Sequence, residues 1–152
     1  MLTAESHYCT CLYRHLPRIS PALFLAVSVC HALPESHYTA SWCAEMGGQA
    51  EVTMPDGSRA DCVTDTHAVE VERAAKFKDS VGQVLHYSRI TGKRPLILLL
   101  LSNESDKRKA SALCKLIKSF HIPIEVVIWN VKNSQRLLLD PDCRSLVVHG
   151  QD

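Results

Sequence analysis

Six consecutive aliphatic residues, 96–101, constrain the fold of this 152-residue chain more than any other segment. A run of this length without a polar position is typical of a strand that is buried on both faces of a sheet. Helical periodicity precedes the run over residues 73–90, and a basic amphipathic pattern follows it over residues 107–120. A second buried strand is expected over residues 122–129. This order of strand, helix and strand predicts parallel neighbours joined by a right-handed crossover.

The part of the chain before this unit predicts a helix followed by an antiparallel meander. The helix is expected over residues 39–46, with Ser36 as its N-cap. Short strands are expected over residues 49–54, 59–63 and 68–72. After residue 130 the patterns weaken, and residues 137–139 and 146–148 are each candidates for an edge strand. We therefore expect an α/β domain over residues 33–152, ordered α-β-β-β-α-β-α-β, with a mixed sheet and helices on both faces.

The first 32 residues have the pattern of a signal peptide. Arg14 and Arg18 precede residues 19–33, which contain no Asp, Glu, Lys or Arg. The apolar centre of this segment is too short to span a bilayer, which requires about 20 apolar residues. A basic start, a short apolar centre and small residues near Ala32 predict secretion, to the periplasm or the medium. A buried N-terminal helix, with Pro21 in its first turn, is the alternative, and the protein would then be cytoplasmic.

Charge and cysteine content narrow the possibilities further. The formal net charge is +1, so no global positive field attracts nucleic acid, and any such binding must come from a local patch. Removing the expected leader leaves four cysteines, which are Cys43, Cys62, Cys114 and Cys143. In an exported domain an even count permits two disulfides with three possible pairings, whereas in the cytoplasm the same residues would remain thiols.

Three carboxylates are expected to converge on one face of the meander. Side chains two residues apart in a strand share a face, so Glu70 and Glu72 project together. In a hairpin with its loop at residues 64–67, Asp61 falls opposite Glu70, with about 5 Å between the Cβ atoms. Such acids repel each other unless a cation lies among them, which predicts a site for a hard metal ion. In the same register Arg59 falls opposite Glu72, so a cross-strand ion pair is the alternative role for that acid.

The helix that follows adds polar side chains to the same region. On a helical wheel Lys76, Gln83 and Tyr87 lie within about 40° of one another, beside the apolar stripe. The stripe itself consists of Phe77, Val81, Val84, Leu85 and Ser88. From this position the three polar side chains are expected to reach a metal ion or a phosphate. Exposed lysines and half-buried tyrosines at such positions also occur without any function.

This arrangement resembles the PD-(D/E)xK nuclease superfamily, whose core has the order α-β-β-β-α-β. The resemblance covers about residues 36–129, with Asp61 at the first acidic position and Glu70 at the second. Glu72 stands where the commoner motif has Lys. Some members carry Glu at this position, and others move the Lys into the following helix, where Lys76 is available.

Two further features of the chain match this superfamily. Glu45 lies in the first helix, where many members place an additional acid. Gln83 and Tyr87 match the Q-x-x-x-Y pattern of one exonuclease-like subset. More narrowly, residues 42–51 and 91–95 are similar to those of a set of small bacterial proteins that carry a leader peptide.

The resemblance implies a phosphodiesterase that depends on Mg²⁺ or Mn²⁺ and cleaves nucleic acid, most simply DNA. Asp61 and Glu70 would bind the metal, Glu72 would bind it or orient the attacking water, and Glu45 would assist. Lys76, Gln83 and Tyr87 would act on the phosphate. Phosphate contacts elsewhere are expected from Lys93, Arg94, Lys107 and Arg108.

The resemblance also places the first helix near the strand of Asp61. A Cys43–Cys62 disulfide would then pin the helix to the hairpin. A catalytically silent module that binds a partner is the alternative function, because Glu72 replaces Lys and the net charge is near zero. An exported domain whose acids only bind a structural cation is a third possibility. The oligomeric state stays open, a homodimer included.

Overall fold

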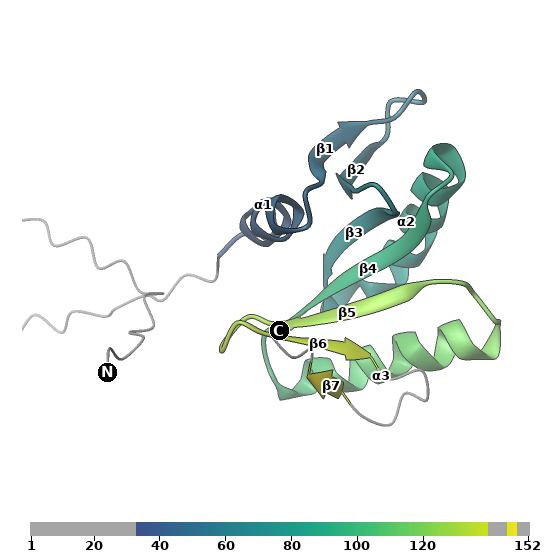
Figure 1. Ribbon diagram of the computed structural model, residues 1–152. Helices are drawn as coiled ribbons and strands as arrows, with labels where there is room; N and C mark the ends of the chain where they lie inside the picture. The colour runs from purple at the N-terminus through teal and green to yellow at the C-terminus, as the bar shows by residue number, and fades with distance from the viewer. Residues whose placement is uncertain (1–32, 140–145, 149–152) are drawn as a thin grey trace, which may run out of the picture. The chain divides into compact units, whose positions relative to one another are not determined.

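The aliphatic run forms the middle strand of a seven-stranded mixed sheet (Figure 1). The structure is a computed structural model that describes residues 33–139 and 146–148. The predicted leader and Cys143 lie outside the described residues. No helix in the described part of the chain is long and apolar enough to cross a membrane.

The strands lie side by side in sequence order, as Figure 1 shows. Their bounds are β1 (Gln49–Thr53), β2 (Arg59–Val63), β3 (His67–Arg73), β4 (Arg94–Leu101), β5 (Glu125–Asn130), β6 (Gln135–Leu139) and β7 (Leu146–Val148). Strands β3, β4 and β5 are parallel neighbours, and the other pairs are antiparallel. Both candidate segments form strands, but of the two only β7 lies at the edge, because β6 pairs with β5 and with β7. The strand predicted over residues 122–129 begins only at Glu125, after Pro123, which cannot donate a ladder hydrogen bond.

Helices cover both faces of the sheet, as predicted. They are α1 (Glu35–Glu45), α2 (Phe77–Thr91) and α3 (Glu104–Ser119), with a 3₁₀ turn η1 (Ala74–Lys76) before α2. Helix α1 starts earlier than predicted, because Pro34 is its N-cap residue in place of Ser36 and has an extended backbone. Helix α2 ends as predicted, with Gly92 in the left-handed conformation at φ 68°.

The main core lies between the sheet and the pair α2 and α3. Ile97, Leu99 and Leu101 of β4 face this layer and pack with Val84 of α2 and Leu113 of α3. The predicted apolar stripe is largely confirmed, since Phe77, Val81 and Leu85 also pack against this core. Residues of one strand alternate between faces, so the opposite face carries Leu96, Leu98 and Leu100.

Helix α1 packs on that opposite face. Its Tyr38 ring meets the Trp129 ring of β5 edge-on, with 5.3 Å between the centroids. The Cys43–Cys62 disulfide joins α1 to β2, with 5.8 Å between the Cα atoms, which confirms the predicted pairing. Gly48 makes room for this bond, because a Cβ atom there would lie 2.7 and 2.9 Å from the two sulfurs.

Strand β2 separates from β3 where the acids begin. The two strands pair through Cys62 with Val69 and through Val63 with Ala68. Continued by one residue, this register places Asp61 opposite Glu70, as the sequence predicts. The described pairing with β3 ends before that position, and β2 continues along β1 instead. The result is an opening in the ladder beside Asp61.

Candidate acid site between β2 and β3

Glu70 and Glu72 project from β3 towards the helical layer formed by α2 and α3. Their neighbours in β4 are Ile97 and Leu99, which belong to the main core. Both acids are almost fully buried, with exposed fractions of 5% for Glu70 and 7% for Glu72. Two carboxyl groups in an apolar layer are costly unless they are neutral or paired with a cation. The stability of the fold alone therefore does not explain why Glu70 and Glu72 are buried.

Glu70 lies at the centre of the acids. Its Oε2 atom is buried and has no hydrogen-bond partner among the described residues. Burial, together with the nearby carboxylates of Asp61, Glu72 and Glu35, raises the pKa of Glu70 to about 8. A buried acceptor without a partner is uncommon in native structures, and one cause of it is an ion that binds there in solution. Glu70 is therefore the strongest single indication of a ligand site.

Asp61 occupies the opening between β2 and β3. Its Oδ2 accepts a hydrogen bond of 2.8 Å from the backbone N–H of Val71 and so replaces a missing ladder bond. Burial raises the pKa of Asp61, the Val71 N–H opposes this shift, and Glu51 and Glu35 add to it. Asp61 is thus held beside Glu70 by the backbone, with its charge disfavoured by its surroundings.

Glu72 meets an acid that the sequence did not indicate. The N–H of Arg73 donates to Oε1 of Glu72 at 2.9 Å and to Oε1 of Glu35 at 3.1 Å. Burial raises the pKa of Glu72 to about 7, and the charge of Glu35 and a side-chain hydrogen bond with it add to the shift. The Arg73 N–H and Lys76 act in the opposite direction. Glu35, in the first turn of α1, is therefore a fourth acid of the site.

The structure does not contain the alternative ion pair between Glu72 and Arg59. The Arg59 guanidinium lies 2.7 Å from Oε2 of Glu51 in the neighbouring strand β1. This follows from the separation of the strands, because β2 has left β3 before it reaches Arg59. Glu72 therefore belongs with the other acids rather than with the surface charges of the hairpin.

The three polar residues of the helical segment differ in their relation to the acids. The Tyr87 side chain is buried, its pKa is raised by burial and by the charges of Glu70 and Asp61, and Gln83 forms a hydrogen bond with it. Lys76, at the end of η1, is exposed and acts electrostatically on Glu72. Tyr87 therefore lies near Glu70 and Asp61, and Lys76 near Glu72, whereas Gln83 is exposed and is connected to the acids only through Tyr87. The Tyr87 ring also packs with Met54, Ala60 and Ala68, so it has a structural role as well.

Glu45 does not join these acids. Its Oε1 lies 2.6 Å from the Arg136 guanidinium of β6, which stacks over Trp129 at 4.2 Å from the ring centroid. Trp129 contacts α1, so Glu45 lies on the face of the sheet opposite to Glu70 and Glu72. The acid of α1 that reaches the site is instead Glu35, ten residues earlier. No sequence pattern indicates Glu35, which lies before the predicted start of this helix at residue 39.

The basic residues predicted to bind nucleic acid fall into two separate groups. Lys93 donates from Nζ to the Asp65 carbonyl at 2.7 Å, and Arg94 pairs with Glu125 at 2.8 Å. Both lie at the start of β4, whereas Lys107 lies beyond its end. The strand between them is about 23 Å long at 3.3 Å per residue. These four residues therefore do not form one patch.

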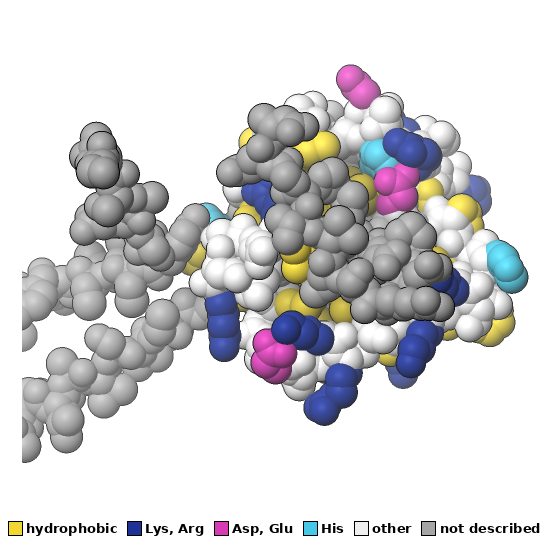
Figure 2. All heavy atoms as spheres, turned by 60° about the horizontal axis from the view of Figure 1, so that its bottom comes forward, with side chains coloured by type: hydrophobic (Ala, Val, Ile, Leu, Met, Phe, Trp, Pro, Cys, Tyr) yellow, Lys and Arg dark blue, Asp and Glu magenta, His cyan; other side chains and the backbone are white. Residues whose placement is uncertain are grey.

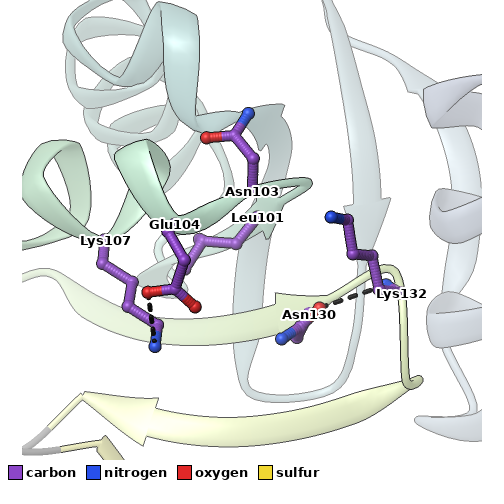
Figure 3. A pocket seen from close by; sticks show the side chains of 6 residues that line it. All are labelled: Leu101, Asn103, Glu104, Lys107, Asn130 and Lys132. Carbon is purple, nitrogen blue, oxygen red and sulfur yellow. Dashed lines mark hydrogen bonds and ion pairs between the residues drawn. The ribbon is translucent and has the colours of Figure 1, made fainter.

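Lys107 lines a pocket at the carboxyl ends of β4 and β5 (Figure 3). The lining residues are Leu101, Asn103, Glu104, Lys107, Asn130 and Lys132. Within it Lys107 is paired with Glu104 at 3.0 Å, and Arg108 beside it is exposed. On the uncovered part of the face in Figure 2, Lys and Arg side chains are spread out with acidic side chains between them.

The acids do not form a ready metal cage. Among residues 33–139 and 146–148, no group of three or more His, Cys, Asp or Glu side chains is arranged to hold a metal ion. Three of the carboxylates instead accept backbone N–H groups, Asp61 from Val71 and both Glu72 and Glu35 from Arg73. The unpartnered oxygen of Glu70 and the raised pKa values are the features that fit a cation. Carboxylate oxygens are the ligands that Mg²⁺ and Mn²⁺ prefer.

Comparisons with known proteins do not assign this chain to a family. No family model, no curated protein and no solved structure matches the chain.

Proposed function

We propose that this protein is a metal-dependent phosphodiesterase that hydrolyses nucleic acid, most simply DNA, with a restriction-endonuclease-like fold. The observation that carries the proposal is buried Glu70, whose Oε2 has no partner while Asp61 and Glu72 lie beside it. A buried acid cluster costs free energy in the absence of a counter-charge. A functional site is the most economical reason for a chain to retain such a cluster.

The topology supports the same function. The acids lie on the second and third strands of an antiparallel meander, and β3 then leads through α2 to its parallel neighbour β4. This α-β-β-β-α-β order, with Asp61 on β2 and Glu70 on β3, is the arrangement that the nuclease resemblance implies. The order of the elements alone does not determine a function, which depends on the chemistry of the site.

Carboxylate oxygens are the ligands that Mg²⁺ and Mn²⁺ prefer, and Asp61 and Glu70 would hold the ion, with Glu72 at its edge. When bound, the ion would supply positive charge to the phosphoryl oxygens and acidity to a water molecule. Glu72, whose pKa is raised to about 7, is suited to accept the proton of the attacking water at a carboxylate oxygen. Lys76 would place its ammonium group against the phosphate. Gln83 would orient the Tyr87 hydroxyl towards the same group.

The proposed setting is outside the cytoplasm. The N-terminal pattern of residues 1–32 and the Cys43–Cys62 disulfide support export, because structural disulfides persist in oxidising compartments. Cys114 is disulfide-bonded as well. Nucleic acid in the periplasm or the medium would then be the substrate.

A silent module that binds a partner is the second candidate. It is favoured by the hydrogen bonds that Asp61 and Glu72 accept from backbone N–H groups, since these carboxylates have partners without any metal. The presence of Glu72 in place of the commoner Lys points in the same direction. In such a module the acids would stabilise the opened ladder and perform no hydrolysis.

Cleavage assays on the oxidised full-length chain separate the two candidates. Linear and circular DNA, and RNA, are incubated with Mg²⁺, with Mn²⁺ or with EDTA, using wild type, Asp61→Ala and Glu70→Ala. Glu45→Ala serves as a control, since Glu45 pairs with Arg136 on the opposite face of the sheet. An enzyme should show metal-dependent cleavage by wild type and the control only. Metal binding without cleavage of any substrate supports the silent module, and equal cleavage by all four proteins excludes the proposed site.

A further inference from the structure

The Cys43–Cys62 disulfide joins the two elements that bring acids to β3 from elsewhere in the chain. Cys62 is the neighbour of Asp61 in β2. Cys43 lies in α1 about two helical turns after Glu35. The bond therefore fixes the strand of one site acid to the helix of another, with 5.8 Å between the two Cα atoms.

Apart from the disulfide, Asp61 is held near β3 by the packing of Ala60 against Ala68 and Tyr87, by a short ladder and by one hydrogen bond. The ladder between β2 and β3 consists of two residue pairs, and both lie on the loop side of Asp61. Beyond these two pairs, the hydrogen bond from the Val71 N–H to the Asp61 carboxylate connects β2 to β3. The hairpin partner β1 is an edge strand with mostly exposed residues, so it adds little to the position of β2 relative to β3. The disulfide is thus a main constraint on the distance between Asp61 and Glu70.

The surroundings of the two sulfurs suit a bond rather than two thiols. Cys43 and Cys62 are 1% and 0% exposed. Gly48 passes so close that a Cβ atom there would collide with both sulfurs, which leaves no spare volume on that side. Two unbonded thiols need more room than a disulfide, so the reduced chain has to separate α1 from β2. That movement would take Glu35 and Asp61 away from β3.

We propose that oxidation of Cys43 and Cys62 is the condition for assembling the acid site, which makes the protein a redox-conditional hydrolase. The two thiols lose two electrons and two protons to a disulfide-containing oxidant, whose own disulfide is reduced to two thiols. Because the sulfurs are buried, this exchange takes place while the chain folds, and the bond is then protected from reductants. In a thiol-rich compartment the acids remain apart. The inference rests on the proposed function and deepens it by naming how the site is regulated.

The consequence is protection of the cell that makes the protein. Before export the chain is in a reducing compartment, where this bond does not persist. Cation binding and hydrolysis would then begin only after the chain has met an oxidant. A nuclease whose site depended on the β3 acids alone would have no such restriction.

The test compares the oxidised full-length chain with Cys43→Ala/Cys62→Ala, and uses Cys114→Ala as a control that removes a different disulfide. Far-UV circular dichroism checks the fold, amide hydrogen exchange reports the Val71 N–H, and Mn²⁺ titration reports the site. The double variant is expected to stay folded, to exchange the Val71 proton more than about tenfold faster, and to bind Mn²⁺ more than about tenfold more weakly. The control should keep both properties.

Unchanged Val71 exchange and Mn²⁺ affinity in a folded double variant would overturn the inference. If the alanine pair does not fold, Cys43→Val/Cys62→Ala restores some of the lost volume. Failure of both pairs to fold would also overturn it, because the bond would then condition the whole fold rather than the site. If wild type binds Mn²⁺ but cleaves no DNA, the proposed function fails while the Val71 comparison still decides this inference.

Discussion

The Asp61 carboxylate accepts the backbone N–H of Val71 at 2.8 Å, in the place where a strand would normally supply a carbonyl group. A single residue thus performs two tasks. It completes the hydrogen bonding of β3 after β2 has turned away, and it sets a negative charge beside Glu70. These two tasks are separable by mutation.

Asp61→Asn keeps a side-chain oxygen for Val71 and removes the charge, whereas Asp61→Ala removes both. We expect Asp61→Ala to lose about 1–3 kcal/mol of unfolding free energy, because a buried N–H loses its partner. Asp61→Asn should lose less, and both variants should lose Mn²⁺ binding. Urea unfolding in EDTA and cation titration measure the two effects. Equal destabilisation by both substitutions would show that the Val71 hydrogen bond does not matter.

The pH dependence of stability should reveal Glu70. Its pKa is raised from an ordinary value of 4.5 to about 8 in the folded protein. Below pH 4.5 the carboxyl group is protonated in both states, so it does not affect folding. Between these two values the unfolded chain releases the proton while the folded chain retains it, so stability falls as pH rises. In EDTA the melting temperature should therefore fall between about pH 5 and pH 8.

Glu70→Gln should flatten this fall and raise the melting temperature at pH 8 by on the order of 10 °C. Glu104→Gln is the matched control, since Glu104 is exposed and should leave the pH profile unchanged. Thermal unfolding followed by circular dichroism gives the curves. A lower melting temperature for Glu70→Gln at the same pH would mean that the Glu70 charge is already compensated.

The close approach at Gly48 predicts a sharp contrast between two glycines. Gly48→Ala would bring a Cβ atom to 2.7 Å from the Cys62 sulfur, and we expect a loss of about 1–3 kcal/mol. Gly82→Ala meets nothing within 4 Å on the exposed side of α2, and should gain about 0.5–1 kcal/mol from helix propensity. Urea unfolding of the oxidised proteins measures both. A neutral Gly48→Ala would show that the sulfurs have room to move.

Two glutamates of α1 should behave differently. Glu35→Gln is expected to weaken Mn²⁺ binding severalfold, because Glu35 shares the Arg73 N–H with Glu72. Glu45→Gln should leave Mn²⁺ binding unchanged, since its partner Arg136 lies on the other face of the sheet. Titration of both variants at one pH provides the comparison. A larger effect at Glu45 than at Glu35 would restore the sequence-based assignment.

Much of this architecture follows from local patterns. Alternation in β2 and β3 places Asp61 opposite Glu70, and the 3.6-residue period of α2 places Tyr87 towards the acids. Both relations depend on short sequence separations, for which strand and helix geometry fix the direction of a side chain. The buried run of β4 and the left-handed Gly92 are predictable for the same reason.

The errors lie where distant segments meet. Which turn of α1 reaches the end of β3 depends on packing across the sheet, so the sequence favours Glu45 and gives little sign of Glu35. The pairing of Arg59 with Glu72 assumes a continuous ladder, whereas β2 leaves β3 early and Arg59 pairs within the outer hairpin. Lys93 and Lys107 are both basic and are therefore both expected to contact phosphate, although the length of β4 separates them.

Titration of Mn²⁺ into the oxidised full-length chain at pH 7, followed by calorimetry in two buffers, is the sharpest test of a metal site at the buried acids. We predict one saturable site and release of about one to two protons for each ion bound, because without a cation Glu70 is protonated and Glu72 is about half protonated at this pH. Glu70→Gln should lose both the binding and the proton release. Absence of binding to wild type, or identical binding to Glu70→Gln, would contradict the assignment of the buried acids to a metal site.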